Sequence, residues 1–443
     1  MKRLLLTTIA LCALAAQGVP AQEPVRHTAP GSLKQFSREP DAPDPETVEN
    51  PEAAESTGTA LERDESIGPE SGEFSILGRT LEPGEFRQFN WQLDTAMAGL
   101  SVPTPVLVAR GQFPGPTLCL VAAVHGDELN GVEIVRRIMF GLEREKLAGT
   151  VLGIPIANAF GFLRGSRYLP DRRDLNRFFP GSADGSMASR FAYALFEQVI
   201  RECNVLIDIH TGSFNRTNLP QLRADLGDDA VLKLSRQFGE MAVLHSEGPG
   251  GSLRGAAADI GIPTVTLEAG GPSQFQANAV DAGVEAIETL LDRLEMLKQF
   301  RMFSAPQPVF YDSTWVRAES GGILLAEVEL GDEVSKGQRL ATVTDPIENR
   351  RETLYAPFRG RILGMALNQV VMPGFAAFHI GRATTDSEAA AVEPETSVTE
   401  DPDAAGPMPS AETLAPEMEA EPESESGPGS EPDTESDTEP EDT

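Results

Sequence analysis

Cysteine, aromatic residues and long apolar runs are scarce in this chain. Only three of its 443 residues are cysteines, and one of them, Cys12, lies in the amino-terminal apolar run. The remaining two, Cys119 and Cys203, are too few for a disulfide-rich scaffold or a zinc ribbon. Both lie in apolar, strand-like segments, which favours the interpretation as separate buried thiols. In an oxidising compartment the two could instead pair. No segment after the first 21 residues is apolar enough to span a membrane.

Positive charge is scarce as well, with 36 Lys and Arg against 68 Asp and Glu and a net charge of −32. The chain ends supply most of this excess: residues 1–21 carry +2, residues 22–72 carry −8, and the segment after Arg382 carries −20, which leaves −6 for residues 73–382. A mildly acidic folded part without a basic patch predicts no nucleic-acid partner. Block charge like that of the tail indicates a solvated segment rather than a capture site for cations or proteins.

The chain ends predict export and disorder. Residues 1–21 have the form of a secretory signal peptide, with Lys2 and Arg3 before an apolar run and a small-residue cleavage site ending at Ala21. We therefore expect an exported protein, periplasmic or secreted. The composition of residues 22–72, rich in Pro, Glu, Ser and Thr, predicts a disordered linker, and residues 383–443 form a predicted disordered acidic tail.

Residues 73–303 alternate short apolar runs with amphipathic stretches. "TLCLVAAVH", "GTVLGIPIAN", "NVLIDIH" and "TVTLEAGG" are typical of buried strands, whereas "LNGVEIVRRIMFGLERE", "ASRFAYALFEQVIREC", "DAVLKLSRQFGEM" and "NAVDAGVEAIETLLDRLEMLKQF" are typical of helices. This alternation predicts an α/β fold with a mixed, largely parallel sheet flanked by helices.

Residues 304–382 change to short β-like runs punctuated by Gly and Asp. "GDEVSKGQRL" and "APFRGRI" resemble the barrel-sandwich of biotinyl and lipoyl carriers, although no Met-Lys pair is present to accept a cofactor. We predict a small all-β module that forms a wall at the mouth of an active site and restricts it to small substrates.

Three potential metal ligands stand at strand ends. His125 and Glu128 have H-x-x-E spacing across a predicted strand-to-helix turn, and His210 ends another strand, with Asp208 two residues before it on the same face. Taken singly, each has a simpler explanation: a core histidine, an acid at a helix start and a turn-capping group. Taken jointly, because ligands collect beyond the carboxyl ends of strands in such sheets, they predict a catalytic Zn²⁺ site that hydrolyses its substrate. No G-x-S-x-G, dinucleotide-binding or phosphate-loop motif suggests another chemistry.

Four motifs in order, "HGDELNG", "DLNRFFPG", "DIHTG" and "TLEAGG", resemble the succinylglutamate desuccinylase/aspartoacylase family, which is itself similar to zinc carboxypeptidases. The resemblance covers residues from about 100 to 382. It implies one zinc ion per chain, held by His125, Glu128 and His210, with Glu268 as the general base.

The same resemblance implies substrate contacts. Asn176 and Arg177 match a carboxylate-binding pair, and a guanidinium fork suits a carboxylate. Arg167 is the nearest match to a further arginine that polarises the substrate, with Arg172 and Arg173 as competitors. Arg254 matches another substrate-side arginine, with an ordinary surface helix position as its alternative.

Three functions remain open at this point. The first is an exported zinc hydrolase that cleaves the amide, or an ester, of a small N-acyl amino acid or a similar substrate with a carboxylate. The second is a zinc carboxypeptidase that trims peptides such as those of the cell wall. The third is a binding protein that has lost catalysis, against which Glu268 beside a complete ligand set argues.

Overall fold

The computed structural model describes residues 73–93, 102–297 and 308–383, all within one unit of the chain, Arg63–Thr443. The predicted signal peptide 1–21, the linker 22–72, the tail beyond Ala383 and the predicted module boundary at 303/304 lie outside the described residues, so these assignments stay predictions. Within the described ranges, no helix combines the length and the apolar character that crossing a bilayer requires.

The described residues up to Leu297 form ten strands and six α-helices. The strands are β1 (Phe74–Ile76), β2 (Arg79–Leu81), β3 (Phe86–Trp91), β4 (Thr104–Arg110), β5 (Phe113–Ala122), β6 (Ala148–Ile154), β7 (Val205–His210), β8 (Arg216–Ala224), β9 (Ala242–His245) and β10 (Thr264–Gly270). The helices are α1 (Leu129–Gly141), α2 (Ala159–Leu163), α3 (Met187–Gln198), α4 (Asp229–Ser235), α5 (Leu253–Asp259) and α6 (Ala277–Arg293). Three 3₁₀ turns accompany them: η1 (Leu175–Arg177), η2 (Ile200–Glu202) and η3 (Arg236–Phe238).

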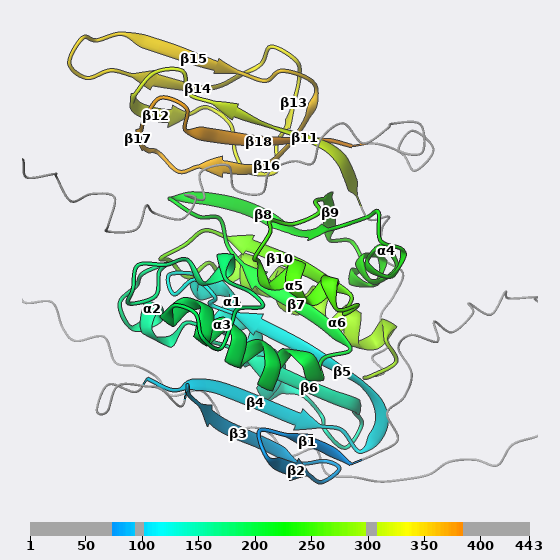
Figure 1. Ribbon diagram of the computed structural model, residues 1–443. Helices are drawn as coiled ribbons and strands as arrows, with labels where there is room; N and C mark the ends of the chain where they lie inside the picture. The colour runs from blue at the N-terminus through cyan, green and yellow to red at the C-terminus, as the bar shows by residue number, and fades with distance from the viewer. Residues whose placement is uncertain (1–72, 94–101, 298–307, 384–443) are drawn as a thin grey trace, which may run out of the picture. The chain divides into compact units, whose positions relative to one another are not determined.

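The central sheet is mixed, as predicted (Figure 1). Its strands lie in the order β9-β8-β10-β7-β5-β6-β4-β3, and the β10-β7, β7-β5 and β5-β6 pairs are parallel. Antiparallel pairing begins on either side of these four strands, at β10-β8 and at β6-β4. The carboxyl ends of β5, β7 and β10 therefore meet at one edge of the sheet, and these are the strands that carry or immediately precede the predicted site residues.

Helices cover both faces of this sheet. On one face, apolar residues of α1, α4 and α6 join those of the strands in one buried cluster, which includes Ile134, Leu234 and Leu290. On the other face, α3 and α5 contribute Phe191 and Leu253 to a second cluster. The strands read as continuous apolar runs because both of their faces are buried.

Several predicted elements are shorter in the structure, and some were not predicted. Helix α1 ends at Gly141 rather than near Glu145, and α4 gives way at Arg236 to a 3₁₀ turn. Strands β8 and β9 and helix α5 had no counterpart in the sequence-based prediction. β8 matters most, because its sequence, RTNLPQLRA, contains Pro220 and alternates poorly, yet the strand lies inside the sheet.

The carboxyl-terminal part is all β, as predicted. It contains β11 (Val309–Arg317), β12 (Gly322–Ala326), β13 (Glu333–Val334), β14 (Arg339–Thr344), β15 (Arg351–Tyr355), β16 (Gly360–Ala366), β17 (Gln369–Val371) and β18 (Ala376–Ala383). Strands β15-β14-β12-β17 form a separate sheet, whereas β13-β16-β18-β11 continue the central sheet. Because β11 pairs with β9 and β16 pairs with β8, the strands β16-β18-β11-β9-β8 form a closed ring.

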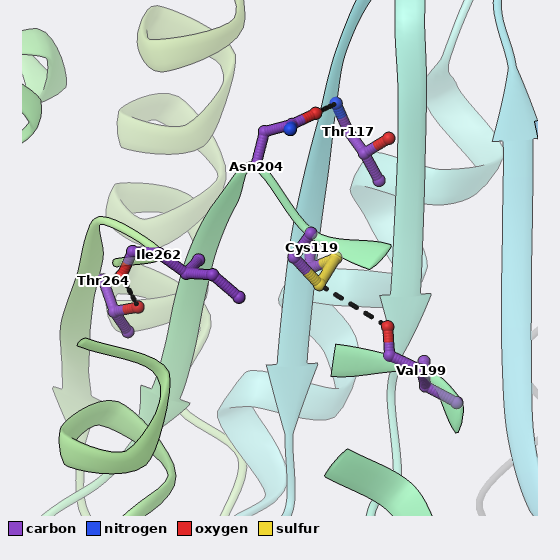
Figure 2. Close-up of a disulfide and its surroundings, with 7 residues drawn as sticks. Thr117, Cys119, Val199, Asn204, Ile262 and Thr264 are labelled. Atoms are coloured by element: carbon purple, nitrogen blue, oxygen red, sulfur yellow. Dashed lines mark hydrogen bonds between the residues drawn. A yellow bond between two sulfur atoms is a disulfide. The ribbon is translucent and has the colours of Figure 1, made fainter. Parts of the chain in front are cut away.

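The two cysteines form a disulfide, so the favoured interpretation as separate packing thiols is wrong (Figure 2). Both are buried, but Cys119 of β5 is bonded to Cys203, which lies just before β7, with 5.7 Å between their Cα atoms. β5 and β7 are parallel neighbours in which Leu118 pairs with Val205. Asn204 reinforces this end, because its side-chain oxygen accepts a 2.7 Å hydrogen bond from the amide of Thr117. The sequence alone could not show that these two strands are adjacent.

Candidate active site

The loop between β5 and α1 presents His125 and Glu128. Gly126 packs so tightly against the backbone of Gly161 that a Cβ at this position would lie 2.0 Å from the Gly161 carbonyl carbon. Glu128 is the residue before α1 rather than part of its first turn, and its side chain makes no capping bond. The side chains of His125 and Glu128 are both buried, that of Glu128 with only 1% of its surface exposed.

Glu128 lies between the two histidines. Its Oε1 is 2.7 Å from Nδ1 of His125, and its Oε2 is 2.9 Å from Nδ1 of His210 and also accepts a 3.2 Å hydrogen bond from the amide of Thr211. One ligand atom from each of the three residues fits within 4.8 Å of the others. Among the described residues, the structure thus brings together the ligand set that the sequence predicted.

A second carboxylate lies behind each histidine. Asp174 Oδ1 is 3.1 Å from Nε2 of His125, and Asp208 Oδ1 is 3.0 Å from Nε2 of His210. Such carboxylates fix the orientation of a histidine ligand and increase its basicity. Asp208 was predicted in this position, whereas Asp174 was missed even though it begins the "DLNR" motif.

The charges of this cluster support one another. Burial alone would raise the pKa of Glu128, but the two histidines hold it far below its ordinary value. Burial and the Arg167 charge disfavour the charged form of His125, yet Glu128 and Asp174 raise its pKa overall. Burial likewise opposes protonation of His210, and Asp208 and Glu128 raise its pKa well above the ordinary value. The cluster is built to hold positive charge beside Glu128, which a proton or a metal cation can supply.

The donor set fits zinc. Two imidazole nitrogens and one carboxylate oxygen are the ligands of many catalytic zinc sites, in which the fourth position stays open. The two nitrogens that face Glu128 are both Nδ1, while both Nε2 atoms already contact carboxylates. In each ring, Nδ1 is therefore the nitrogen that can bind the metal, and Nε2 is the nitrogen that an aspartate orients.

Glu268 stands beside this set. It lies on β10 in parallel register with His210 on β7, and it is buried. Asn218 donates a 2.9 Å hydrogen bond to its Oε2, and Nε of Arg223 lies 3.2 Å from its Oε1. Burial raises the pKa of Glu268 above the ordinary value, although Arg223 and His210 oppose the shift.

Two of the predicted substrate residues, Asn176 and Arg177, lie in η1. Asp174 begins this turn by accepting a 2.9 Å hydrogen bond from the amide of Asn176. The Asn176 side chain is fixed by the amide of Leu253, which donates to its oxygen, and its nitrogen lies 3.5 Å from Nε2 of His210. Arg177 is only half-buried.

The other predicted arginines are buried at the site. Arg167 donates to Oδ2 of Asp174, with 2.9 Å from its Nη2, whereas Arg172 and Arg173 are exposed. Arg254 is 3% exposed and donates to the carbonyl and hydroxyl oxygens of Ser246, so it is no surface arginine.

All the predicted site residues line one pocket of about 60 Å³. Ten further residues of its lining were not predicted from the sequence, among them Asn218, Arg223, Arg216, Ser252 and Trp315. Arg216 stacks its guanidinium on the indole of Trp315, with 5.1 Å to the ring centroid. Among the described residues of the carboxyl-terminal β part, Trp315 of β11 is the one that lines this pocket.

Residues 114–294 match the family model of the succinylglutamate desuccinylase/aspartoacylase catalytic domain. Among characterised proteins, the N-alpha-acetyl-L-2,4-diaminobutyric acid deacetylase of Halomonas elongata is 28% identical over 279 residues, which are 58% of this chain and 80% of that protein.

Solved structures show the same fold. A succinylglutamate desuccinylase from Silicibacter sp. TM1040 has a TM-score of 0.62 at 22% identity, covering 72% of this chain and 98% of its own. The product-bound ectoine utilization protein EutE (DoeB) from Ruegeria pomeroyi gives the same TM-score and identity, with 72% and 99% covered. A succinylglutamate desuccinylase/aspartoacylase from Rhodobacter sphaeroides has a TM-score of 0.63 at 20% identity, with 70% and 100% covered.

The fold and the buried His-Glu-His set define a metal-binding hydrolase domain. The matching model identifies residues 114–294 as a catalytic domain of the succinylglutamate desuccinylase/aspartoacylase family. The chain is a deacylase of that family, with His125, Glu128 and His210 as its metal-binding residues.

Proposed function

We propose that this protein is an exported, zinc-dependent deacylase that hydrolyses the amide bond of a small N-acyl amino acid or a related substrate with a carboxylate. The observation that carries the proposal is the presence, in one small pocket, of a complete metal-ligand set, a separate buried glutamate and several arginines. A binding protein would need no such glutamate beside the ligand set.

The metal would be held by His125, Glu128 and His210, with Asp174 and Asp208 orienting the two imidazoles. Zinc bound there would polarise the acyl carbonyl and make a water molecule acidic enough to attack it near neutral pH. The buried position of the three ligands strengthens these electrostatic effects, because few water molecules screen them.

Glu268 is proposed as the general base. It takes a proton from the attacking water and passes one to the nitrogen of the leaving amine. A general base works best when its pKa lies near the operating pH, and burial moves the pKa of Glu268 in that direction. Its place in register with His210 sets the carboxylate beside the ligand set rather than within it.

Arginines and an amide are proposed to bind the substrate. Arg177 is half-buried at the pocket, where a planar guanidinium can hold a carboxylate through two parallel bonds, and Asn176 next to it can donate a further bond. Arg167, held by Asp174, is placed to polarise the acyl oxygen, and Arg254 contributes positive charge from the side of α5. The surplus of arginine over carboxylate in the pocket favours a substrate with negative charge.

The size of the pocket favours small substrates over peptides. Its volume of about 60 Å³ is far below the 300–1,000 Å³ that is typical of sites for larger ligands. Trp315 of β11 forms part of the lining, which supports the proposal that the carboxyl-terminal part of the chain limits access to the pocket.

Export is supported by the form of residues 1–21 and by the buried Cys119–Cys203 disulfide. Disulfides form and persist in oxidising compartments such as the periplasm and the cell exterior, and they are rare in the cytosol. The amino terminus of mature protein, purified from cells that express the full chain, tests this part: an amino terminus at Gln22 supports export, and an uncleaved cytosolic chain contradicts it.

The deacylase proposal is tested with a substrate panel. N-α-acetyl-L-2,4-diaminobutyrate, N-acetyl-L-aspartate, N-succinyl-L-glutamate and a tripeptide are incubated with zinc-loaded protein, and the released amine is measured. We expect at least one N-acyl amino acid to be cleaved and the peptide to be left intact. Cleavage of the peptide alone would favour a carboxypeptidase.

Glu268→Gln is the decisive variant, because it keeps the size of the side chain and removes the base. It should keep its fold and zinc, bind substrate, and lose about a hundredfold or more in kcat. Glu143→Gln, the same change at an exposed site, is the control and should behave as wild type. Loss of zinc from Glu268→Gln would make Glu268 a ligand, and near-normal turnover would mean that the base lies elsewhere.

A further inference from the structure

Strand β8 is shared between the catalytic sheet and the carboxyl-terminal β strands. One of its edges pairs with β10, which carries Glu268, and the other edge pairs with β9 and, near its start, with β16. β8 therefore lies between β10, which carries the proposed general base, and β16, which comes some 95 residues after Glu268 in the chain.

Two side chains of β8 hold the Glu268 carboxylate. Asn218 donates to Oε2 at 2.9 Å and Arg223 lies 3.2 Å from Oε1, so each carboxylate oxygen has its own partner. A register shift in β10 between Glu268 and Gly270 brings Asn218 opposite Gly270 while Gln221 stays opposite Glu268. This irregularity allows one strand to reach the carboxylate from two directions.

The Asn218 side chain is in turn confined by β16. Asn218 pairs with Gly364 in the β8-β16 register, and a Cβ at position 364 would lie 2.6 Å from Oδ1 of Asn218. Gly364 thus leaves the space that the amide occupies. Three residues along β8, Gln221 donates a 3.4 Å hydrogen bond to the carbonyl of Leu363, so the two strands are tied on both sides of this contact.

We propose that Asn218 and Arg223 are positioning residues for Glu268, and that Gly364 of the carboxyl-terminal part keeps Asn218 in place. On this proposal, which rests on the proposed function of Glu268, the β module does more than limit access to the pocket. It completes the support of the general base.

The physical reason is the freedom of a glutamate side chain. Glu268 has three rotatable bonds, and burial alone does not choose the direction of its carboxylate. Two charge-assisted contacts from different directions fix that direction, and a displacement of about 1 Å in a catalytic group can cost a hundredfold in rate. An added methyl group at 364 would push the Asn218 amide and, through it, the Glu268 carboxylate.

The test is a double-mutant cycle on the best-cleaved substrate of the panel. Gly364→Ala should lower kcat roughly 10- to 100-fold, with KM within about threefold and with zinc content unchanged, because a hydrogen bond to a charged group is disturbed while the ligand set is not. Asn218→Ala should lower kcat to a similar extent. In the Asn218→Ala background the clash is absent, so adding Gly364→Ala should cost almost nothing further.

Two other variants serve as the control and as a replacement for Gly364→Ala. Gly381→Ala is the matched control. Its added Cβ would meet side-chain carbons of Leu363 in β16 and of Phe310 in β11, without touching Asn218. It should lower thermal stability and leave kcat nearly unchanged. If Gly364→Ala does not fold, Asn218→Asp serves instead, because it fits the same space, offers no N–H to Glu268 and should also lose kcat.

The outcomes separate this proposal from the function on which it rests. If wild type turns over the panel and Glu268→Gln abolishes turnover, but the Asn218 and Gly364 variants keep full kcat, the positioning proposal is wrong. It is equally wrong if the two losses multiply in the double variant, since Gly364 would then act independently of Asn218. A wild type without activity, or an active Glu268→Gln, would instead overturn the proposed function.

Discussion

Removing the Cys119–Cys203 disulfide should destabilise the protein strongly without removing its metal site. The bond closes a loop with a sequence separation of 84 residues. In the chain-entropy account, a cross-link of that span restricts the unfolded chain by about 4.5 kcal/mol, within the measured range of about 2–5 kcal/mol for native disulfides. For a folded part of this size, that corresponds to a drop in Tm of roughly 10 °C.

The metal site should survive, because the disulfide joins β5 to the chain just before β7, ahead of the carboxyl ends at which the site lies. Cys119 precedes His125 by six residues, and Cys203 precedes His210 by seven. Near the bond, the mutual hydrogen bonds of Asn204 and Thr117 still tie β5 to β7. We therefore expect zinc content near one per chain in the reduced protein at temperatures well below its melting point.

The assay compares oxidised and reduced wild type, which contain the same side chains, by thermal and urea unfolding. The Cys119→Ala/Cys203→Ala double variant should match the reduced form to within the small cost of two lost sulfur atoms. Equal midpoints for oxidised and reduced protein would refute the entropic argument. Two free thiols in protein taken from an oxidising compartment would refute the bond itself.

Three further predictions concern the site and the chain ends. Because nearby carboxylates raise the pKa of His125 and His210, protons compete with zinc, and zinc affinity should fall about tenfold per pH unit for each proton displaced as the pH drops. In the metal-free protein, the stability that these protonated histidines contribute is lost as the pH rises through their raised pKa values. The rise in Tm on adding zinc should therefore grow between pH 5.5 and 8.5, and a constant rise would contradict this. Arg177→Ala should cost roughly 2–4 kcal/mol in kcat/KM for substrates with a free carboxylate and much less for their methyl esters, whereas equal losses would remove the assignment of a carboxylate clamp. Deleting residues 22–70 and 384–443 should leave Tm and zinc content nearly unchanged, since neither segment has a hydrophobic face to bury, and a large drop in Tm would show that one of them packs on the core.

Residues at the ends of parallel strands could be found from the sequence. His125, His210 and Glu268 each follow an apolar run, and the rule that such ends meet at one edge of a sheet is enough to bring them together. Glu128 follows His125 within one turn of the chain, so its place needed no knowledge of distant contacts. The structure places all four in one pocket.

Residues that depend on antiparallel or distant pairing could not be found in this way. Cys119 and Cys203 are joined because β5 and β7 are neighbours, which the chain order does not state, since β6 comes between them in sequence. Asp174 begins a recognised motif, but its contacts with His125 and Arg167 depend on where a loop folds. Trp315 lines the pocket only because β11 pairs with β9.

β8 is the most instructive of these omissions. Its sequence lacks regular alternation because its residues face different partners: Asn218 contacts Glu268, Gln221 contacts the carbonyl of Leu363, and Leu222 lies in the apolar core. A strand that contacts a charged group on one side and a carboxyl-terminal strand on the other cannot keep a simple apolar pattern, because buried polar groups must find partners wherever those lie. The weak pattern that hid β8 from prediction thus has the same cause as its proposed role. The metal ligands follow from the parallel strands, whereas the proposed support of Glu268 follows from the strand at which the parallel order reverses.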